Sequence, residues 1–579
     1  MKKFLNKYWP WGLTLVLGVA VWLFWLLGHP QQLAYQEQFQ LFLLGSDYFC
    51  TCLSVPGGLA RWLGEFLTQF YNNPAYGATV LALLFMLLQR LSWQTLKHAG
   101  HLFYPLSFLS PVVLLWYAMG DENVLLAYAV ALLVALACCW AVSRVRVAAA
   151  FVVALAGMPL LYWLIGPMAM LTAAYMAVVL PLRAQTRRVT LLGAGLTAVV
   201  MVALSLVVSA HRLPYQLDHL MMGLCYYRVV TMLPIMLMAI PAVAVVLAAA
   251  GSIRPMKSTA LKEGAMTAVV ALLAVFLVPQ GYDAKKAELM DYDFLVRTGQ
   301  WQAIISKAER QMPDLPMSVS ATNLALAMEN QLGDRAFHFY QRGTQGLLPP
   351  FERNFATTML TGEIYYNMGM VNTAQRMAFE AMEAIPNNAK STRALKRLAE
   401  TNLINGQYAV ARKYLLLLQK TLFYGKWATQ TMTLLGDEAK INAHPVYGRM
   451  RQLRLADNFL FSEQEGDKMC GQLFLHNTQN AVAMQYLLLW PLLQRDIPSF
   501  MQYVQVVQQR TSYNPRHVQE AICYAFGQQQ QRPPQELVDN MVQQQFLQFA
   551  KAFNQGGRQN TAQLQPFRNT VWYYLVNGQ

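Results

Sequence analysis

Charged residues are scarce in this sequence: only 13% of the 579 residues are Asp, Glu, Lys or Arg. The first 280 residues hold 16 of the 45 Lys and Arg and 7 of the 30 Asp and Glu, and the cationic ones lie in short segments between apolar runs. The formal charge of +15 therefore does not form the basic stripe that a nucleic-acid-binding protein presents. We expect no nucleic-acid partner.

Familiar catalytic motifs are also missing. No phosphate-binding glycine loop occurs, because Pro56-Gly57-Gly58 follows no strand and precedes no Gly-Lys-Ser/Thr. The seven cysteines show no metal-ligand spacing; Cys470 and Cys523 would pair in an oxidising compartment, but isolated buried thiols are the simpler expectation. The sequence thus offers no evident cofactor, although it leaves a divalent metal open.

What the sequence does contain is a series of apolar runs, most of them near the ~20 residues that a helix needs to cross the hydrocarbon layer. The first lacks a signal-peptide cleavage site, so we interpret it as an uncleaved anchor. The pattern predicts a polytopic transmembrane bundle of about nine spans in residues 1–280. The predicted spans are residues 9–28, 76–91, 102–120, 124–142, 147–165, 168–182, 189–210, 229–251 and 265–279.

The segments between these runs alternate in charge. One set carries 13 Lys and Arg with a single acid, and the other carries three Arg with six acids. The positive-inside rule then places the amino terminus in the cytoplasm and, after nine crossings, residues 281–579 outside it. No ionisable residue lies in the middle of a run, which argues against an ion-coupled transporter.

Residues 281–579 have the mixed composition of a water-soluble helical domain. Gly299, Gly333, Gly369 and Gly406 follow one another at 34, 36 and 37 residues, each between two apolar helical stretches. Residues 281–425 are predicted to form repeats that resemble tetratricopeptide repeats, and residues 426–579 a further helical-repeat region, in an extracytoplasmic α-solenoid. The residues expected at close helix contacts, turns and helix ends of the third repeat are Gly362, Tyr365, Gly369, Ala374, Ala381 and Pro386.

The long first outer loop, residues 29–75, carries aromatic and aliphatic residues at helical spacing. We expect it to form two amphipathic helices that lie on the outer membrane surface. An acidic residue, Glu37, follows the first span directly.

This arrangement resembles the GT-C superfamily of glycosyltransferases, which use lipid-linked sugars. The resemblance lies in the cytoplasmic amino terminus, the acid after span one, the long first outer loop and the extracytoplasmic domain. It implies transfer of a sugar from a polyprenyl phosphate at the outer membrane face. The departure is that Glu37-Gln38 stands where many of these enzymes have two adjacent acids.

For such chemistry a carboxylate must take the acceptor proton, and cations must stabilise the departing phosphate. The candidate catalytic residues are Glu37, Asp47, Asp121 and Glu122, the last two of which would position the acceptor or a metal. The candidate phosphate-binding residues are Arg61, His211, Arg212 and Arg228, and Asp218 and His219 are weighed in the same way against the simpler interpretation of charges at helix ends as solvated boundaries.

The whole chain is also similar to an uncharacterised family of Bacteroidota membrane proteins, through residues 37–42, Pro56-Gly57-Gly58-Leu59 and residues 66–70. The similarity implies a location in the bacterial inner membrane with a periplasmic carboxy-terminal domain. Three functions remain open: a glycosyltransferase whose repeats bind the acceptor or a partner, a non-catalytic scaffold that recruits envelope proteins, and a lipid or glycan transporter.

Overall fold

The computed structural model describes residues 2–97, 103–229, 231–253, 259–352, 354–386, 389–455, 465–559 and 561–577. Most of these residues are helical, and they contain no strand beyond two isolated bridges. The chain divides into two compact units. Unit 1 consists of Met1–Ala287 with Ile385–Thr392 and Leu417–Lys426, and unit 2 of Glu288–Ala384, Arg393–Leu416 and Trp427–Gln579.

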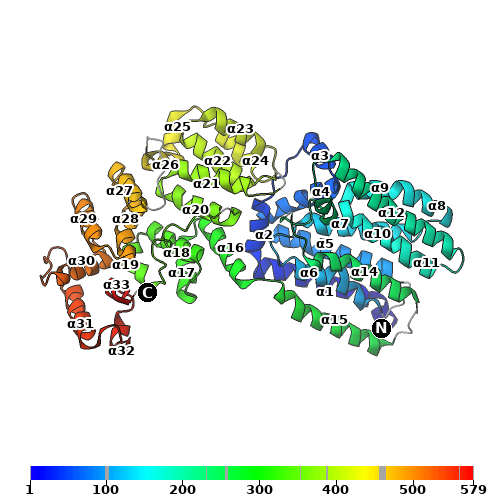
Figure 1. Cartoon of the computed structure of the whole chain (residues 1–579), viewed down its shortest axis with the longest axis horizontal. Coiled ribbons are helices and arrows are strands. Elements are labelled where there is room, and N and C mark those ends of the chain that lie inside the picture. Colours follow the sequence, from blue (N-terminus) through cyan, green and yellow to red (C-terminus); the bar gives the residue numbers. More distant parts are fainter. Residues whose placement is uncertain are drawn as a thin grey trace. The chain divides into compact units, whose positions relative to one another are not determined.

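Unit 1 is a bundle of helices (Figure 1). Its α-helices are α1 (Lys2–Leu23), α2 (Pro30–Gln38), α3 (Ser46–Leu53), α4 (Gly58–Thr68), α5 (Pro74–Leu96), α6 (Leu114–Ala118), α7 (Leu126–Val142), α8 (Val147–Val152), α9 (Met158–Ile165), α10 (Ala169–Ala174), α11 (Leu180–Arg183), α12 (Arg188–Arg212), α13 (Leu217–Met222), α14 (Ile235–Ile253) and α15 (Ala260–Gln280). Short π and 3-10 segments extend or join them: η1 (Phe24–Gly28), η2 (Gln69–Asn72), η5 (Pro105–Phe108), η6 (Leu109–Val113), η7 (Val153–Gly157), η8 (Gly166–Met168) and η9 (Tyr175–Val179).

Six helical runs in the described residues are long and apolar enough to cross a membrane. Shorter apolar helices occupy Pro105–Ala118 and Leu126–Val142, where two more spans are predicted. The outward faces of the long helices are apolar too, as on α12, where Leu192, Leu196, Val200 and Leu204 are exposed at a spacing of four residues. Such faces suit contact with lipid, so unit 1 is compatible with a multi-pass membrane protein; the number of nine spans stays a prediction. The long runs are Trp9–Gly28, Pro74–Leu96, Ala149–Arg183, Arg188–Arg212, Ile235–Ile253 and Ala260–Gln280.

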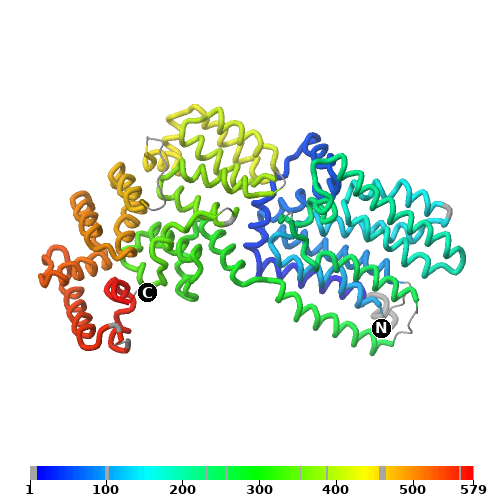
Figure 2. Tube along the Cα trace, viewed as in Figure 1, coloured from blue at the N-terminus to red at the C-terminus, as the bar shows by residue number. Residues whose placement is uncertain are grey.

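The longest run folds back on itself at Gly166, whose φ of +73° reverses the chain direction. A side chain at Gly193 of α12 would meet Phe151 of α8, and one at Gly195 would meet Ala177 of η9. Both arms of the run therefore lie beside the same turn of α12, and Figures 1 and 2 show them side by side. The run is thus two antiparallel helical arms.

Buried polar contacts join the helices of unit 1. The Thr14 hydroxyl of α1 donates to Gln89 Oε1 of α5 at 2.9 Å, and Gln89 Nε2 donates to Ser107 Oγ at 2.7 Å. A polar group in an apolar environment is costly unless it is bonded, so these contacts fix how α1, α5 and η5 face one another.

The first outer loop differs from its prediction. Residues 40–44, within the stretch where helical spacing was expected, form no helix, and they separate α2 from α3. The backbone of Leu41 donates to Lys390 O at 2.9 Å, and that of Leu44 donates to Lys420 O at 2.7 Å. Phe42 is buried, packed against the rings of Trp62 and Phe66. These aromatic side chains therefore pack inside unit 1, because late segments of the chain supply hydrogen-bond partners that the local sequence does not show.

Unit 2 is a succession of paired helices. They are α16 (Ala284–Arg297, which begins in unit 1), α17 (Trp301–Arg310), α18 (Pro316–Met328), α19 (Leu332–Arg335), η10 (Ala336–His338), α20 (Phe355–Met368), α21 (Val371–Glu383), α22 (Thr392–Ile404, whose first residue belongs to unit 1), α23 (Tyr408–Leu418, which ends in unit 1), α24 (Gly425–Met432, which begins in unit 1), α25 (Glu438–Ala443), α26 (Tyr447–Leu453), α27 (Gly466–His476), α28 (Ala481–Gln494), α29 (Ile497–Gln508), α30 (Arg516–Gln528), α31 (Asn540–Gly556), η12 (Gly557–Gln559), α32 (Thr561–Leu564), η13 (Gln565–Phe567) and α33 (Val571–Asn577).

The third predicted repeat corresponds to α20 and α21. Gly362 faces Met377 across the pair, since a side chain at position 362 would lie 3.1 Å from Met377 Cβ. Gly369 ends α20 with a φ of +96°, a conformation that favours glycine. Tyr365, Ala374 and Ala381 are buried, and Pro386 follows the end of α21. The tetratricopeptide class itself stays a prediction.

The prediction that Gly333 forms the turn is wrong. Gly333 lies inside α19, and the left-handed residue of that turn is Asn330, with a φ of +56°. Asparagine takes this conformation more readily than most residues, which a search for glycines alone overlooks. The proposed Cys470–Cys523 pair is also absent: all seven cysteines are free thiols, and both of these are buried. Arg254, Lys257, Asn387 and Asn388, used in the topology and repeat predictions, lie outside the described residues.

Candidate functional site

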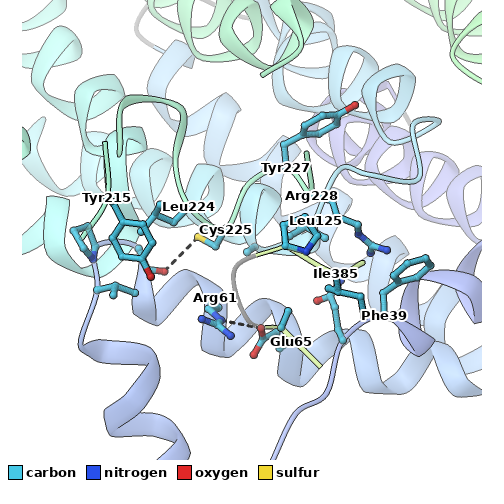
Figure 3. A pocket seen from close by; sticks show the side chains of 17 residues that line it. Phe39, Arg61, Glu65, Leu125, Tyr215, Leu224, Cys225, Tyr227, Arg228 and Ile385 are labelled. Atoms are coloured by element: carbon cyan, nitrogen blue, oxygen red, sulfur yellow. Dashed lines mark hydrogen bonds and ion pairs between the residues drawn. The ribbon is translucent and has the colours of Figure 1, made fainter. Parts of the chain in front are cut away.

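A small cavity lies in unit 1 where residues 39–65, the Tyr215–Arg228 segment and the late residues Ile385, Pro386 and Ala389 meet (Figure 3). Its volume is about 70 Å³. Two of the predicted phosphate-binding residues, Arg61 and Arg228, line it. The full lining is Phe39, Gln40, Val55, Pro56, Gly57, Arg61, Glu65, Leu125, Ala127, Tyr215, Leu224, Cys225, Tyr227, Arg228, Ile385, Pro386 and Ala389.

The cavity depends on a close approach at Gly57, the residue before α4. Gly57 has a φ of +87°, and a side chain there would lie 3.1 Å from Cys225 Sγ. Its backbone N–H donates to Trp163 O at 2.9 Å. Glycine at this position lets the start of α4 pack against both the Cys225 segment and α9. The Pro-Gly-Gly motif is therefore a tight bend that positions Arg61 one turn later.

The backbone of Arg228 is hydrogen-bonded, whereas the two terminal nitrogens of its guanidinium have no partner. Its N–H donates to Asn123 O at 2.8 Å, beside the antiparallel bridge between Val124 and Tyr227. The guanidinium stacks on the Phe39 ring at 3.6 Å from the ring centre. Its two terminal nitrogens are shielded from solvent and have no hydrogen-bond partner, although the residue as a whole is half-buried.

The charge of Arg228 persists despite this burial. Burial lowers its pKa to about 10, an effect that Tyr35, Glu122 and Asp121 oppose. At neutral pH the side chain is a cation whose donors are aimed at no protein acceptor. Buried donors in proteins normally have partners, so this arrangement points to an anionic ligand.

An ion pair on α4 also lines the cavity. Arg61 Nε donates to Glu65 Oε1 at 2.9 Å, and the hydroxyl of Tyr48 on α3 donates to Glu65 Oε2. Burial lowers the pKa of Arg61, but the Glu65 carboxylate more than offsets this, so the net pKa is raised. A carboxylate has about four acceptor positions, so Glu65 can accept a further proton donor from the cavity.

Residues from the second half of the chain also line the cavity and contact Glu37. Ile385, Pro386 and Ala389 form one wall, and the Tyr424 hydroxyl donates to Glu37 Oε2 at 3.1 Å. Glu37 is buried in α2, yet it does not line the cavity. The structure therefore places Glu37 in the interior of unit 1, outside the cavity lining.

The acid pair of the second outer loop also lies behind the cavity wall. Asp121 accepts a hydrogen bond from the hydroxyl of Tyr227, which lines the cavity, and its Oδ1 accepts from the Asn123 backbone at 2.9 Å. Glu122 is paired with Lys286 at 2.9 Å. Burial and Asp121 together raise the pKa of Tyr227, so its hydroxyl stays protonated.

The remaining candidates lie apart from this cavity. Asp47 is exposed in the first turn of α3, and His211 and Arg212 are exposed at the end of α12. Asp218 is exposed and His219 half-buried on α13. None of the five lines the cavity.

Three residues of the site were not predicted: Glu65, Tyr227 and Tyr424. The signal for Glu65 was its spacing of four residues from Arg61, which puts both on one helical face. No local signal marks Tyr424, which is 387 residues from Glu37. Among the described residues, no three His, Cys, Asp or Glu side chains gather as a metal site would require.

Comparison with known proteins gives one match. A family model described as "Family of unknown function (DUF6057)" matches residues 7–578. No curated protein and no solved structure matches the chain.

Proposed function

The chain belongs to this family of unknown function over nearly its whole length, and we propose from its geometry that it is a glycosyltransferase. In this proposal it resembles GT-C enzymes and transfers a sugar from a polyprenyl phosphate at the outer membrane face. The observation that carries the proposal is a cavity lined both by Arg228, whose two terminal nitrogens are unbonded, and by the Arg61–Glu65 pair.

The cavity suits the phosphate of such a donor. Its volume of about 70 Å³ is several times the ~10–15 Å³ that one buried water needs, which leaves room for a phosphate group. Arg228 donates to the phosphate oxygens, and these charge-assisted bonds strengthen as the phosphate departs. The sugar then lies at the cavity mouth.

Glu65 is the carboxylate that this cavity offers for the proton transfer. The acceptor hydroxyl oxygen forms a bond to the anomeric carbon, the bond from that carbon to the phosphate oxygen breaks, and Glu65 takes the hydroxyl proton. The products are the glycosylated acceptor and the free polyprenyl phosphate. Asp121 accepts a hydrogen bond from Tyr227, which lines the cavity, so in this proposal Asp121 is a positioning residue; Glu37 and its partner Tyr424 lie outside the cavity lining.

The topology belongs to the same proposal. The two arms that meet at Gly166 count as two spans, and with the two shorter apolar helices the number becomes nine. The amino terminus is then cytoplasmic, unit 2 is periplasmic in a Bacteroidota inner membrane, and its repeats bind the acceptor or a partner protein.

The test is envelope glycan profiling in a deletion strain that is complemented with single variants. Glu65→Gln keeps the size and accepts from Arg61 but cannot take the proton, so we expect a ~10²–10⁴-fold loss of product at normal protein level. Arg61→Ala, Glu37→Gln and Asp121→Asn should give smaller losses. The matched control is Asp47→Asn, an exposed acid outside the cavity, which should restore the glycan. Full restoration by Glu65→Gln would exclude its catalytic role.

One observation favours the second candidate, a non-catalytic envelope scaffold. Arg61, Glu65 and Glu37 all have internal partners, and the loop of residues 39–44 is bonded to late segments of the chain, as in a structural joint. A scaffold needs the hydrogen-bonded connection between these segments, but it does not need the charges of these three side chains. Its function should therefore survive Glu65→Gln and fail only when the fold or the repeat surface is altered.

A further inference from the structure

Two late segments of the chain belong to unit 1, and their only charged residues are lysines. The segments are Ile385–Thr392 and Leu417–Lys426. They contain Lys390, Lys420 and Lys426 and no Asp or Glu. All three lysines are exposed, and none forms an ion pair with a described residue. Three cationic groups are thus available to a partner outside the chain.

Two of the helical runs that are long enough to cross a membrane are antiparallel. Thr14 of α1 donates to Gln89 of α5 at 2.9 Å. Further along α1, the indole of Trp22 donates to Thr79, which lies earlier in α5, at 3.2 Å. The end of the first run and the start of the second, at Pro74, therefore mark one boundary of the hydrocarbon layer.

The second late segment is fixed to this boundary. The hydroxyl of Tyr424 accepts a hydrogen bond from Asn72 Nδ2 at 3.4 Å, and the ring of Phe423 lies 5.9 Å from that of Phe70. Asn72 precedes Pro74 by two residues, which is at most ~7 Å of extended chain. One headgroup layer has a similar depth of ~5–7 Å. The segment therefore lies at headgroup level in a bilayer that contains both runs.

Exposed apolar side chains lie beside the lysines. Leu422 is 46% exposed, and Leu44, whose backbone N–H donates to Lys420 O at 2.7 Å, is 48% exposed. Tyr76, in the first turn of α5, is exposed as well, as is typical of aromatic residues at a membrane boundary. A surface with leucines that enter the boundary of the acyl chains, and with lysines that reach the phosphates, binds anionic membranes.

We propose that the two late segments bind the headgroups of anionic phospholipids and thereby attach helices α21 to α24 to the bilayer. Residues 39–47, which the segments contact, contain one charged residue, Asp47, so three lysines against one aspartate leave a net charge of +2. This charge complements phosphatidylglycerol, whereas a zwitterionic headgroup has no net charge to attract it. The lipid-anchoring surface consists of Leu44, Lys390, Lys420, Leu422 and Lys426.

The attachment also bears on the cavity. Ile385, Pro386 and Ala389 form one of its walls, and all three belong to the first late segment. Binding of this segment to headgroups holds that wall in place. The inference goes beyond the proposed function and does not depend on it, because the lipid contact can be measured without any sugar transfer.

The experiment measures contact between the surface and defined lipids. Full-length protein with Leu422→Cys carries a fluorophore at position 422, and Cys50→Ser removes an exposed cysteine that would also react. Nanodiscs contain phosphatidylcholine with a minor fraction of phosphatidylglycerol, and a nitroxide quencher is attached near the headgroup of either lipid. We expect both lipids to quench the fluorophore, with phosphatidylglycerol the more effective at equal quencher content. The same protein without Leu422→Cys gives the background.

Charge variants identify the cause of the preference. A lysine near an anionic membrane surface raises affinity about fivefold, so the combined change of Lys390, Lys420 and Lys426 to Gln should abolish the preference for phosphatidylglycerol. High salt should weaken it in the wild type. The matched control should retain the preference, because it changes three exposed lysines of unit 2 to Gln, namely Lys440, Lys468 and Lys551.

Three results would overturn the inference. If neither lipid quenched the fluorophore, the lysines would face water and serve a soluble acidic partner instead. Equal quenching by the two lipids in the wild type would show that the lysines select no headgroup. A preference that survives the triple lysine variant would assign it to other residues.

Discussion

Replacing Arg228 by methionine should strengthen the fold and abolish phosphate binding. The change keeps an unbranched side chain against Phe39 but removes a charge whose two terminal nitrogens are buried without partners. Few substitutions of a buried charged residue should stabilise a protein, so the sign of this effect is diagnostic. A stabilising effect would show that Arg228 is present to bind a ligand, and a destabilising effect would show that the fold requires it.

The magnitude follows from three opposing contributions. Each buried donor without a partner costs ~1–3 kcal/mol, so two of them cost ~2–6 kcal/mol. The stacking of the guanidinium on Phe39, at 3.6 Å, contributes ~1–2 kcal/mol in a desolvated setting. A methionine sulfur recovers ~0.3–1.5 kcal/mol against the same ring. We therefore expect Arg228→Met to raise the free energy of unfolding by ~3 kcal/mol, the middle of the range that these contributions give together.

The assay is thermal unfolding of the detergent-solubilised protein at one scan rate, with and without polyprenyl phosphate. The wild type should gain stability with ligand, by ~2.7 kcal/mol at a hundredfold excess over Kd, and Arg228→Met should gain none. Arg90→Met is the matched control, because Arg90 stacks on Trp11 at the same 3.6 Å and has no unbonded buried nitrogens among those identified. Arg90→Met should have a slightly lower unfolding midpoint than the wild type. A lower unfolding midpoint for Arg228→Met, or an unchanged ligand response, would refute the reasoning.

Three further predictions concern other parts of the chain. Burial lowers the pKa of His29, so the unfolded chain binds its proton more readily; stability should fall as the pH drops below 6.5. Thermal midpoints in a pH series should show a flatter fall for His29→Gln, and identical slopes would disprove the assignment. In unit 2, Ala381→Leu should overpack a buried position and lower the free energy of unfolding by ~1–3 kcal/mol, whereas Glu383→Leu, exposed on the same helix, should change it little. A periplasm-active reporter fused after Gln280 should be active and one fused within residues 183–188 silent; the reverse at the first point would show a miscounted span.

The sequence was informative wherever one physical requirement dominates. Crossing a hydrocarbon layer demands long apolar runs, so the helices of unit 1 were found at nearly their observed positions. Arg61 and Arg228 stood out because only three Arg lie in their set of connecting segments, and both line the cavity. Gly369 was found as a turn because few residues other than glycine accept its φ of +96°.

The predictions that were wrong have a common cause, which is contact between segments that are far apart in the sequence. Residues 39–44 have the spacing of a helix, but the backbone N–H groups of Leu41 and Leu44 donate to Lys390 O and Lys420 O, and residues 40–44 form no helix. Glu37 looked like a free acid after the first span, whereas Tyr424 covers it. Local patterns carry no information about partners more than 340 residues away, and the cavity is built from such partners.

The pool of polyprenyl-phosphate-linked sugars in cells that carry Arg228→Met tests the central claim most directly. If the cavity binds the donor phosphate for transfer, mass spectrometry of extracted lipids should show the donor accumulating as in the deletion strain, with normal levels of the variant protein. A wild-type donor pool in the Arg228→Met strain, alongside an altered pool in the deletion strain, would contradict it.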